Sequence, residues 1–311
     1  MNLSSLFASL PGACSQGILW GVMALGVYTT YRILNISDLT VDGSFATGGC
    51  VAAVCLVNGI NPILSLLIAM IAGVVAGAIT GFLHTRCEIP AILAGILTQL
   101  GLYSINLRIM GRSNTPLLKV DTLFSQVKDV LPISSQVASI LVGAVIIVLI
   151  VAAMYWFYGT EIGSAIRATG NNEHMVESLG VNTKTTKMLG FMMANGLVAL
   201  SGALISQSQG YADVKQGTGA IVIGLASIII GEVVCGKRRN FMVRLSTIVV
   251  GSVLYRVVVS IVLQLGLSTD DLKLLTAVLV ALALTAPVVL EKRAQKKRYL
   301  ANVEGEGEDH A

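Results

Sequence analysis

The fold class is decided by the stretch Pro62-Ile-Leu-Ser-Leu-Leu-Ile-Ala-Met-Ile-Ala-Gly-Val-Val-Ala-Gly-Ala-Ile-Thr-Gly-Phe-Leu-His84, which contains no Asp, Glu, Lys or Arg. About 20 apolar residues are enough for a helix to cross the hydrocarbon core of a bilayer. The stretch therefore predicts a membrane-spanning helix. Gly73, Gly77 and Gly81 recur within it at every fourth position, a spacing that lets helix backbones approach closely in lipid. We expect this glycine face to pack against another helix.

Similar apolar stretches recur along most of the chain. Including the first, they cover residues 10–31, 43–57, 62–84, 90–107, 136–158, 189–207, 219–235, 243–265 and 272–290. Of the 311 residues, 54% are hydrophobic and only 12% are charged, whereas soluble domains carry about 25% charged residues. The sequence therefore predicts an all-α, polytopic membrane protein with about nine transmembrane helices, within a range of eight to ten. Residues 1–290 are expected to form a single membrane domain.

The basic residues predict how the chain is oriented. Residues 291–311 form a basic and then acidic tail, which we place in the cytoplasm and expect to be disordered. Counting the spans backwards then puts the N-terminus outside. Because cytoplasmic loops carry an excess of Lys and Arg, the orientation is supported by the few basic residues that it leaves outside: Arg108, Arg112, Lys119, Lys128, Lys215 and Lys273. A net charge of +4 located at helix ends does not indicate a nucleic-acid partner.

The sequence lacks the residue patterns of an enzyme or a metal site. Its five cysteines and three histidines are scattered, and none forms a metal-ligand or nucleophile motif. The segment from Gly231 to Arg238 resembles a phosphate-binding loop, but Arg238 stands where Ser or Thr would be needed to hold Mg²⁺. We therefore predict no catalytic residue, no metal site and no cofactor bound by this chain.

Polar residues at the start of the second apolar stretch are candidates for a substrate path. Residues 36–49 are rich in Gly and polar residues and lead into an unusually short apolar run. Irregular backbone at membrane depth is tolerated where protein or a water-filled cavity covers it, and such broken helices often line transport sites. Thr40, Asp42 and Ser44 are therefore candidate pathway residues in a broken second helix. The alternative is that Asp38 and Asp42 only cap a helix at the membrane interface.

Further polar residues lie inside other spans. Gln99, Tyr103 and Asn106 share one face of the fourth predicted helix, which should point toward other helices or a pore. Interhelical hydrogen bonding explains this stripe as well as a substrate path does. Arg256 is the one basic residue well inside a span, and Glu232, backbone carbonyls or a neighbouring subunit could pair with it. Either a pathway role or a structural ion pair fits Arg256.

The most specific pattern is the polar segment Glu161-Ile-Gly-Ser-Ala-Ile-Arg-Ala-Thr-Gly-Asn-Asn-Glu-His-Met-Val-Glu-Ser-Leu-Gly-Val-Asn-Thr-Lys-Thr-Thr-Lys187. It resembles the cytoplasmic loop of ATP-binding cassette (ABC) importer permeases of the branched-chain amino acid and ribose type. The positions that match the family's pattern, in order, are Gly163, Arg167, Ala168, Gly170, Asn172, Gly180 and Asn182. Met175 and Val176 depart from the pattern, since a small residue is usual there. Within the family, the chain is similar to permeases that accompany tryptophan- or tyrosine-type binding lipoproteins.

The resemblance implies a transporter subunit of the bacterial plasma (inner) membrane that is not itself an enzyme. It implies separate ATPase subunits that bind ATP and Mg, an extracytoplasmic substrate-binding lipoprotein that delivers an amino acid, and a second permease copy. Residues 159–188 would form the coupling loop that contacts the ATPase. In that loop Asn171 or Asn172 would cap a short helix, on which Met175, Val176 and Leu179 would form an apolar stripe. Met175 and Leu179 are four residues apart and share one face.

Three other functions fit parts of the sequence. A secondary transporter driven by H⁺ or Na⁺ would use Asp42, Glu232 and Arg256 as an ion relay. A membrane scaffold or channel would show no saturable uptake. An ABC permease for a sugar or nucleoside would differ from an amino acid permease only in its substrate.

Overall fold

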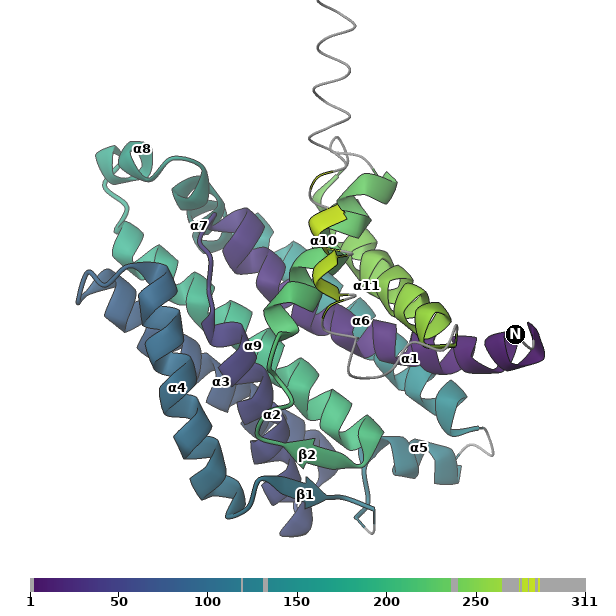
Figure 1. Ribbon diagram of the computed structural model, residues 1–311. Helices are drawn as coiled ribbons and strands as arrows, with labels where there is room; N and C mark the ends of the chain where they lie inside the picture. Colours follow the sequence, from purple (N-terminus) through teal and green to yellow (C-terminus); the bar gives the residue numbers. More distant parts are fainter. Residues whose placement is uncertain are drawn as a thin grey trace, which may run out of the picture.

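The computed structural model describes residues 3–118, 120–130, 134–235 and 240–264, together with residues 274, 276–278, 280–282 and 285. The described chain is a bundle of helices with one small sheet (Figure 1). The long helices are α1 (Leu3–Tyr28), α2 (Thr40–Val57), α3 (Pro62–Thr85), α4 (Ala91–Met110), α6 (Ser135–Gly159), α9 (Thr183–Gln209), α10 (Ala220–Cys235) and α11 (Phe241–Gln264). The shorter elements are a π-helical turn (Thr29–Ile33), α5 (Leu123–Val130), α7 (Glu161–Asn171), α8 (Glu173–Ser178), β1 (Asn114–Pro116) and β2 (Tyr211–Asp213).

The predicted all-α membrane fold is confirmed, but the number of spans is not. Among the described residues, seven helices are long and apolar enough to cross a membrane, and α10 is a shorter apolar helix. The first eight predicted stretches each coincide with one of the long helices. The ninth stretch, 272–290, falls mostly outside the described residues, as does the whole predicted tail 291–311.

Local sequence signals explain where several helices begin and end. At the start of α3, the side chain of Asn61 accepts the N–H of Ile63 at 2.9 Å, and Pro62 occupies the first turn. Helix α4 ends at Gly111 and α9 ends at Gly210, both with positive φ (67° and 74°). Glycine adopts this left-handed conformation without the steric cost of a side chain. These are signals that a sequence displays without any tertiary information.

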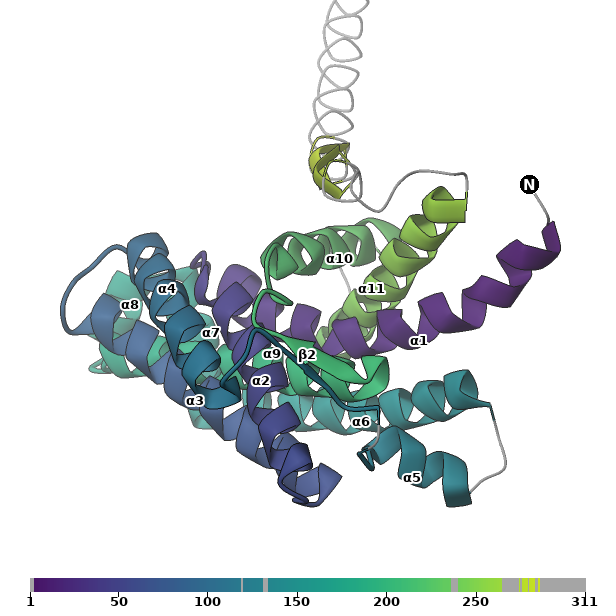
Figure 2. The same cartoon turned by 60° about the horizontal axis from the view of Figure 1, so that its bottom comes forward.

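The helices form an inner group and an outer group. The spans of α2 and α9 are 72% and 67% buried, whereas those of α4 and α6 are only 28% and 33% buried. The exposed faces of the outer helices carry large apolar side chains such as Leu100 and Val148. Apolar side chains exposed along whole helix faces are suited to contact with lipid. Figure 2 shows α10 and α11 side by side over α1, on the other side of the inner helices from α3 and α4.

The glycine face of α3 packs against α9, as its spacing predicts. A β-carbon added to Gly73 would lie 2.4 Å from the carbonyl oxygen of Asn195, and one added to Gly77 would lie 2.3 Å from that of Phe191. No larger residue fits at these two positions without moving a helix backbone. Close approach of α3 and α9 therefore depends on these glycines.

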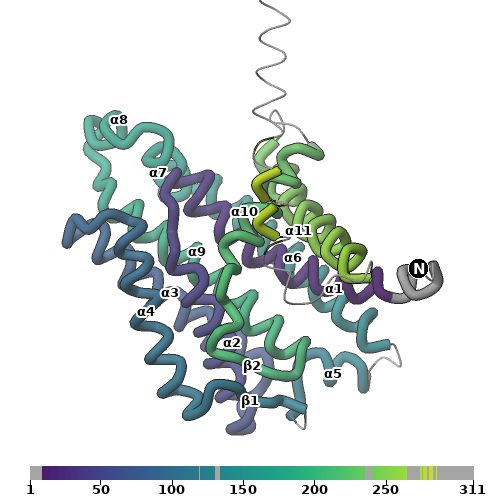
Figure 3. Tube along the Cα trace, viewed as in Figure 1, coloured from purple at the N-terminus to yellow at the C-terminus, as the bar shows by residue number. Residues whose placement is uncertain are grey.

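The irregular backbone expected in the second span lies just before α2 rather than within it. Helix α2 is continuous from Thr40 to Val57. The chain between the π-helical turn and α2 is non-helical and includes Asn35 with φ of +56°. Figure 3 shows this connection running from the end of α1, beside α7, to the start of α2. The glycines of α2 serve close packing: a β-carbon on Gly48 would lie 1.9 Å from the carbonyl oxygen of Ala199.

The two ends of the bundle differ. Strands β1 and β2 pair antiparallel, with Thr115 opposite Ala212, at the end where α4 and α9 finish. Helices α7 and α8 lie at the opposite end (Figure 1). The polar segment 161–187 thus forms a separate helical layer at one end of the membrane helices.

Candidate functional site

Four of the seven predicted pathway residues line one cavity, which we call the α2–α4 cavity. It has a volume of about 330 Å³ and is lined by Asp42, Gln99, Tyr103 and Asn106, among others. Lys215 and Thr218, from the connection between β2 and α10, complete its polar lining. The polar stripe of α4 therefore faces α2 and this connection.

Asn106 is the most unusual residue of this cavity. Its side chain is only 1% exposed, and neither its amide nitrogen nor its amide oxygen has a hydrogen-bond partner among the described residues. A buried polar group without a partner costs about 1–3 kcal/mol. The Asn106 amide thus offers one donor group and one acceptor to a polar molecule that enters the cavity.

Asp42 links α2 to the start of α10. Its carboxylate accepts the backbone N–H groups of Gly219 at 2.8 Å and Ile221 at 3.0 Å. The carboxylate therefore caps the N-terminus of α10, where a negative charge is favourable. The alternative of a capping role is supported, but the capped helix is α10 rather than the helix that carries Asp42.

Thr40 and Ser44 face away from the cavity into a buried polar network. The hydroxyl oxygens of Thr40 and Thr80 are 2.7 Å apart, and Thr80 donates to Thr98 at 2.9 Å. Ser44 donates to the Asn195 side-chain oxygen at 2.6 Å. The network thus joins α2 to α3, α4 and α9.

Asp38 and Asn195 were not among the predicted site residues, although they complete this network. The Asn195 amide nitrogen donates to the Asp38 carboxylate at 2.7 Å, and the Thr40 N–H donates to it at 2.9 Å. Burial raises the pKa of the Asp38 carboxyl above its usual range, while the hydrogen bonds from Thr40 and Asn195 act in the opposite direction. The sequence feature that could have predicted this network is Asn195 itself, because it places an amide side chain in an otherwise apolar stretch.

Arg256 lies on α11 against α1 and does not line the α2–α4 cavity. Its guanidinium carbon is 4.2 Å from the ring centroid of Trp20, and one guanidinium nitrogen is 3.4 Å from the Gln16 side-chain oxygen. Stacking over an indole face stabilises a desolvated cation. Glu232, which the sequence offered as a partner for Arg256, instead accepts a hydrogen bond from Arg32 at 2.7 Å.

The segment 161–187 forms α7, α8 and the start of α9, and its Asn and Gly residues set the boundaries. Asn172 caps α8 by accepting the Met175 N–H at 3.1 Å, and Asn182 caps α9 by accepting the Thr185 N–H at 3.3 Å. Gly180, between them, has φ of +82°. The predicted short helix with an asparagine cap is confirmed, with Asn172 as the cap.

The apolar stripe of α8 is divided between an inner and an outer face. Val176 is buried, whereas Met175 and Leu179 are 48% and 74% exposed. Met175 lies in α8 and Leu179 directly follows it, and α8 is at one end of the molecule (Figure 1). Exposed apolar residues grouped on one short helix are typical of a protein contact.

Helix α7 is fixed directly to the end of α1. Gly170 approaches the backbone of Ile33 and Leu34 so closely that a β-carbon at position 170 would overlap them. Gly163 is similarly close to the backbone of Phe157 at the turn from α6. Arg167 and Ala168, between these glycines, line a cavity with Tyr28 and Arg32 at the end of α1.

An ion pair joins α8 to the first turns of α9. Glu173 pairs with Lys187, and Thr183 donates to Glu177 at 2.6 Å. Burial alone would raise the pKa of the Glu173 carboxyl, but the hydrogen bond and positive charge of Lys187 hold it below its usual value. These contacts make α7, α8 and the start of α9 one connected unit.

The three groups of a possible ion relay are not connected. Asp42 binds backbone N–H groups, Glu232 pairs with Arg32, and Arg256 contacts Trp20 and Gln16. Each group therefore has a separate partner within the described part of the chain. No direct contact among the three carries a proton or cation from one to the next.

Comparison with known proteins identifies the family. Residues 10–285 match the model of the branched-chain amino acid transport system permease component. The chain is 40% identical over 266 residues to a tyrosine transport system permease protein of Clostridioides difficile. The matched region covers 86% of this chain and 87% of that protein. It is 27% identical over 218 residues to an inner membrane ABC transporter permease protein of Escherichia coli, covering 68% of this chain and 63% of the other.

A solved structure has the same fold. It is a chain of PsaBC from Streptococcus pneumoniae in complex with Fab. The match covers 90% of this chain and 95% of that chain, with a TM-score of 0.51 and 15% sequence identity. The fold, the polar segment 161–187 and the family match agree with one another, and the resemblance drawn from the sequence is confirmed. The chain therefore belongs to the branched-chain amino acid transport system permease family, whose members are membrane-spanning subunits of ABC transporters.

Proposed function

We propose that this chain forms the translocation path of an ATP-driven importer for an aromatic or branched-chain amino acid. The family's description and the tyrosine transport permease with 40% identity both support an amino acid as the substrate. As a permease subunit the chain is not an enzyme, and ATP hydrolysis takes place on a separate chain. ATP and Mg bind that ATPase in our proposal.

The proposed assembly contains two copies of this permease, two ATPase subunits and an extracytoplasmic substrate-binding lipoprotein. An ATPase and a substrate-binding partner are implied by the family, and the homodimer is our addition. The N-terminus lies outside and the C-terminal tail lies in the cytoplasm of a bacterial inner membrane. Residues 1–290 form one membrane domain, within which residues 159–188 are the coupling segment.

The coupling segment docks on the ATPase through its exposed tip. Met175 and Leu179 insert into an apolar groove of the partner, while Asn172, Gly180 and Asn182 fix the shape of the tip. Gly163, Arg167, Ala168 and Gly170 hold α7 against the ends of α6 and α1. A movement of the ATPase is thereby transmitted to the membrane helices as a rigid-body displacement.

The observation that carries this proposal is the contact of Gly170 with Ile33 and Leu34. These residues begin the connection that leads directly into α2. Helix α2 in turn carries Asp42, which lines the α2–α4 cavity. A displacement of α7 is therefore transmitted through the short connection before α2 to the wall of the α2–α4 cavity.

The α2–α4 cavity is the proposed contact site for substrate on its way across. Asn106 and Gln99 supply amide groups, Tyr103 supplies a half-exposed aromatic ring, and Lys215 supplies a positive charge. An amino acid has both a carboxylate for the ammonium of Lys215 and a polar amino group for the amide oxygens. In this assignment Thr40, Ser44 and Arg256 support the helices that shape the path.

The test is uptake by the complete importer in proteoliposomes. With ATP inside, labelled tyrosine or leucine should accumulate, and excess unlabelled ribose or nucleoside should not compete. Asn106→Leu should raise the KM for uptake, whereas Ser246→Ala, an exposed position of α11, should not. Uptake by this chain alone, driven by an ion gradient, would replace the proposal with a secondary transporter. Competition by ribose or a nucleoside would change the substrate class.

A further inference from the structure

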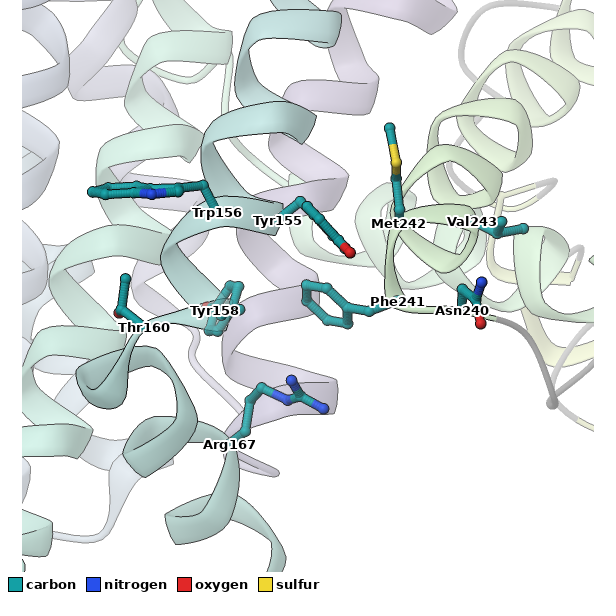
Figure 4. A pocket seen from close by; sticks show the side chains of 10 residues that line it. Tyr155, Trp156, Tyr158, Thr160, Arg167, Asn240, Phe241, Met242 and Val243 are labelled. Atoms are coloured by element: carbon teal, nitrogen blue, oxygen red, sulfur yellow. The ribbon is translucent and has the colours of Figure 1, made fainter.

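A second hollow lies where α6, α7 and α11 meet, far from the α2–α4 cavity in the sequence. We call it the interfacial pocket. It has a volume of about 790 Å³ and is lined by Tyr155, Trp156, Arg167, Phe241 and Met242, among others. Figure 4 shows the aromatic side chains of α6 on one side, the first residues of α11 on the other, and Arg167 extending from α7 below them.

The pocket lies at the end of a membrane span. Tyr155 and Trp156 are in the last two turns of α6, and their side chains are 51% and 72% exposed. Tyr and Trp at the ends of transmembrane helices occupy the headgroup level of a bilayer. The interfacial pocket therefore opens toward the lipid headgroups, on the side of the bundle that carries α7.

An adjoining cavity makes this region strongly basic. It has a volume of about 720 Å³, shares Arg167 and Phe241 with the interfacial pocket, and adds Arg32 and Arg244. Arg32 pairs with Glu232. Neither Arg167 nor Arg244 has a carboxylate partner among the described residues, and no Asp or Glu is found among the described residues lining either cavity.

The Arg167 guanidinium is held in place by an aromatic ring rather than by a carboxylate of the described residues. The guanidinium carbon of Arg167 lies 5.2 Å from the ring centroid of Phe241, a cation–π contact that leaves its N–H donors available. Phe241 is itself packed edge-on against the ring of Tyr158, with the ring centroids 5.4 Å apart. Arg244 is half-buried one turn further along α11. Planar guanidinium groups of this kind suit a phosphate better than a single carboxylate, because each offers several donors.

We propose that the interfacial pocket binds the phosphate-bearing headgroup of an anionic phospholipid. The phosphate lies where the interfacial pocket meets the adjoining cavity, and there it accepts hydrogen bonds from Arg167, which lines both, and from Arg244, which lines the adjoining cavity. The glycerol and the start of the acyl chains contact Tyr155, Trp156 and Met242 at the lipid-facing mouth of the pocket. This apolar, aromatic mouth favours a lipid over a free phosphate ion. Since Arg167 belongs to α7, the bound lipid would hold the coupling segment against the membrane helices.

The two tryptophans of the chain provide a direct test. Trp20 is buried beneath Arg256, and Trp156 lines the pocket. In the full chain carrying Trp20→Phe, Trp156 is the only tryptophan. This chain is reconstituted in phosphatidylcholine bilayers in which either phosphatidylcholine or phosphatidylglycerol carries brominated acyl chains. The brominated phosphatidylglycerol should quench Trp156 with about thirtyfold higher apparent affinity, the factor expected from two basic residues acting on an anionic lipid.

Variants assign this preference to the pocket. Arg167→Gln and Arg244→Gln together should make the two brominated lipids equally effective quenchers, and Arg167→Lys should retain most of the preference because the charge remains. Lys184→Gln is the matched control. Lys184 lies in the same terminal layer, is 52% exposed and faces Glu88 at 3.5 Å outside the pocket. Its removal should leave the preference unchanged. In the chain carrying Trp156→Phe instead, the remaining Trp20 should show no preference.

Two results would overturn the proposal. The first is equal quenching by the two lipids when Arg167 and Arg244 are present, in protein whose thermal unfolding is unaltered. The second is loss of the preference on addition of inorganic phosphate or glycerol phosphate at millimolar concentration, which would assign the pocket to a soluble anion. Since transport is not measured, the outcome is independent of the proposed importer function.

Discussion

The α-carbon of Gly170 lies against the backbone of Ile33, so that a β-carbon at position 170 would stand only 1.8 Å from the Ile33 carbonyl oxygen. Gly170 is in α7, whereas Ile33 ends the π-helical turn that follows α1. Only a residue without a side chain permits this contact. It joins the terminal layer of short helices to the connection that enters α2.

Gly170→Val should therefore separate α7 from the end of α1. Overpacking a tight contact costs about 1–3 kcal/mol, and here the strain falls on the path from the ATPase to α2. We expect the chain to reach the membrane while uptake of labelled tyrosine by the complete importer falls at least about tenfold, the factor equivalent to 1.4 kcal/mol. Gly101→Val is the control, since nothing lies within 4 Å of a β-carbon there. Normal uptake by the Gly170 variant would show that this contact does not transmit coupling.

Asn172→Ala should loosen α8 selectively. The substitution removes the side-chain acceptor of the Met175 N–H, and loss of an N-cap costs about 1 kcal/mol. Amide hydrogen exchange at Met175 should accelerate by about fivefold, the factor equivalent to that cost. Asn171→Ala, at the adjacent position, removes no helix cap and should leave this exchange rate unchanged. Equal effects of the two substitutions would contradict the assignment of the cap.

Met175→Glu with Leu179→Glu should prevent stable association with the ATPase. The exposed apolar tip of α8 would acquire two charges that must be desolvated in an apolar groove. Co-purification with the ATPase measures the effect, and we expect the ATPase to be lost from the purified complex. His174→Glu adds a charge to the same helix about 100° around its axis from Met175, and should leave the complex intact. Retention of the ATPase by the double variant would exclude this tip as the docking surface.

The contact of Glu173 with Lys187 should give the terminal layer a specific pH dependence. The pKa of the Glu173 carboxyl is lower in the folded chain than in the unfolded chain, where it is about 4.3. The ion pair therefore stabilises the fold fully above the unfolded pKa, and this stabilisation is lost as the pH falls through the folded pKa. Hydrogen exchange in α8 should therefore be slower in the unsubstituted chain than in Glu173→Gln at pH 7. The two should converge once the pH falls below the lowered pKa of Glu173 in the folded chain. A difference that persists in acid would assign the effect to packing rather than to charge.

Two buried asparagines should respond in opposite ways to the same substitution. Asn195→Leu removes the partner of Asp38 and Ser44, and leaving such groups unpaired costs about 1–3 kcal/mol. Asn106→Leu removes an amide that has no hydrogen-bond partner in the described part of the chain, so thermal stability in detergent should be unchanged or higher. Its uptake of tyrosine should nevertheless show a raised KM. Destabilisation by Asn106→Leu would indicate that its amide has a structural role.

Local properties of the sequence predicted a large part of this architecture. The run from Pro62 to His84 predicts α3 because hydropathy and helix length are properties of a single segment. The four-residue spacing of Gly73 and Gly77 predicts a close helix contact for the same reason, although it does not name α9 as the partner. Asn172 and Gly180 likewise predict helix boundaries, since helix caps and left-handed turns involve only a few neighbouring residues.

The sequence by itself thus determined that this is a helical membrane protein with a polar segment of the permease type, and the tertiary structure decided how its polar residues are used. Thr40, Asp42 and Ser44 are neighbours in sequence, yet only Asp42 reaches the α2–α4 cavity. Arg32 pairs with Glu232, which is 200 positions further along the chain, and Arg256 stacks on the ring of Trp20 instead of pairing with Glu232. Hydropathy and helical periodicity describe one segment at a time, whereas these partners depend on the rotation and spacing of helices packed against one another.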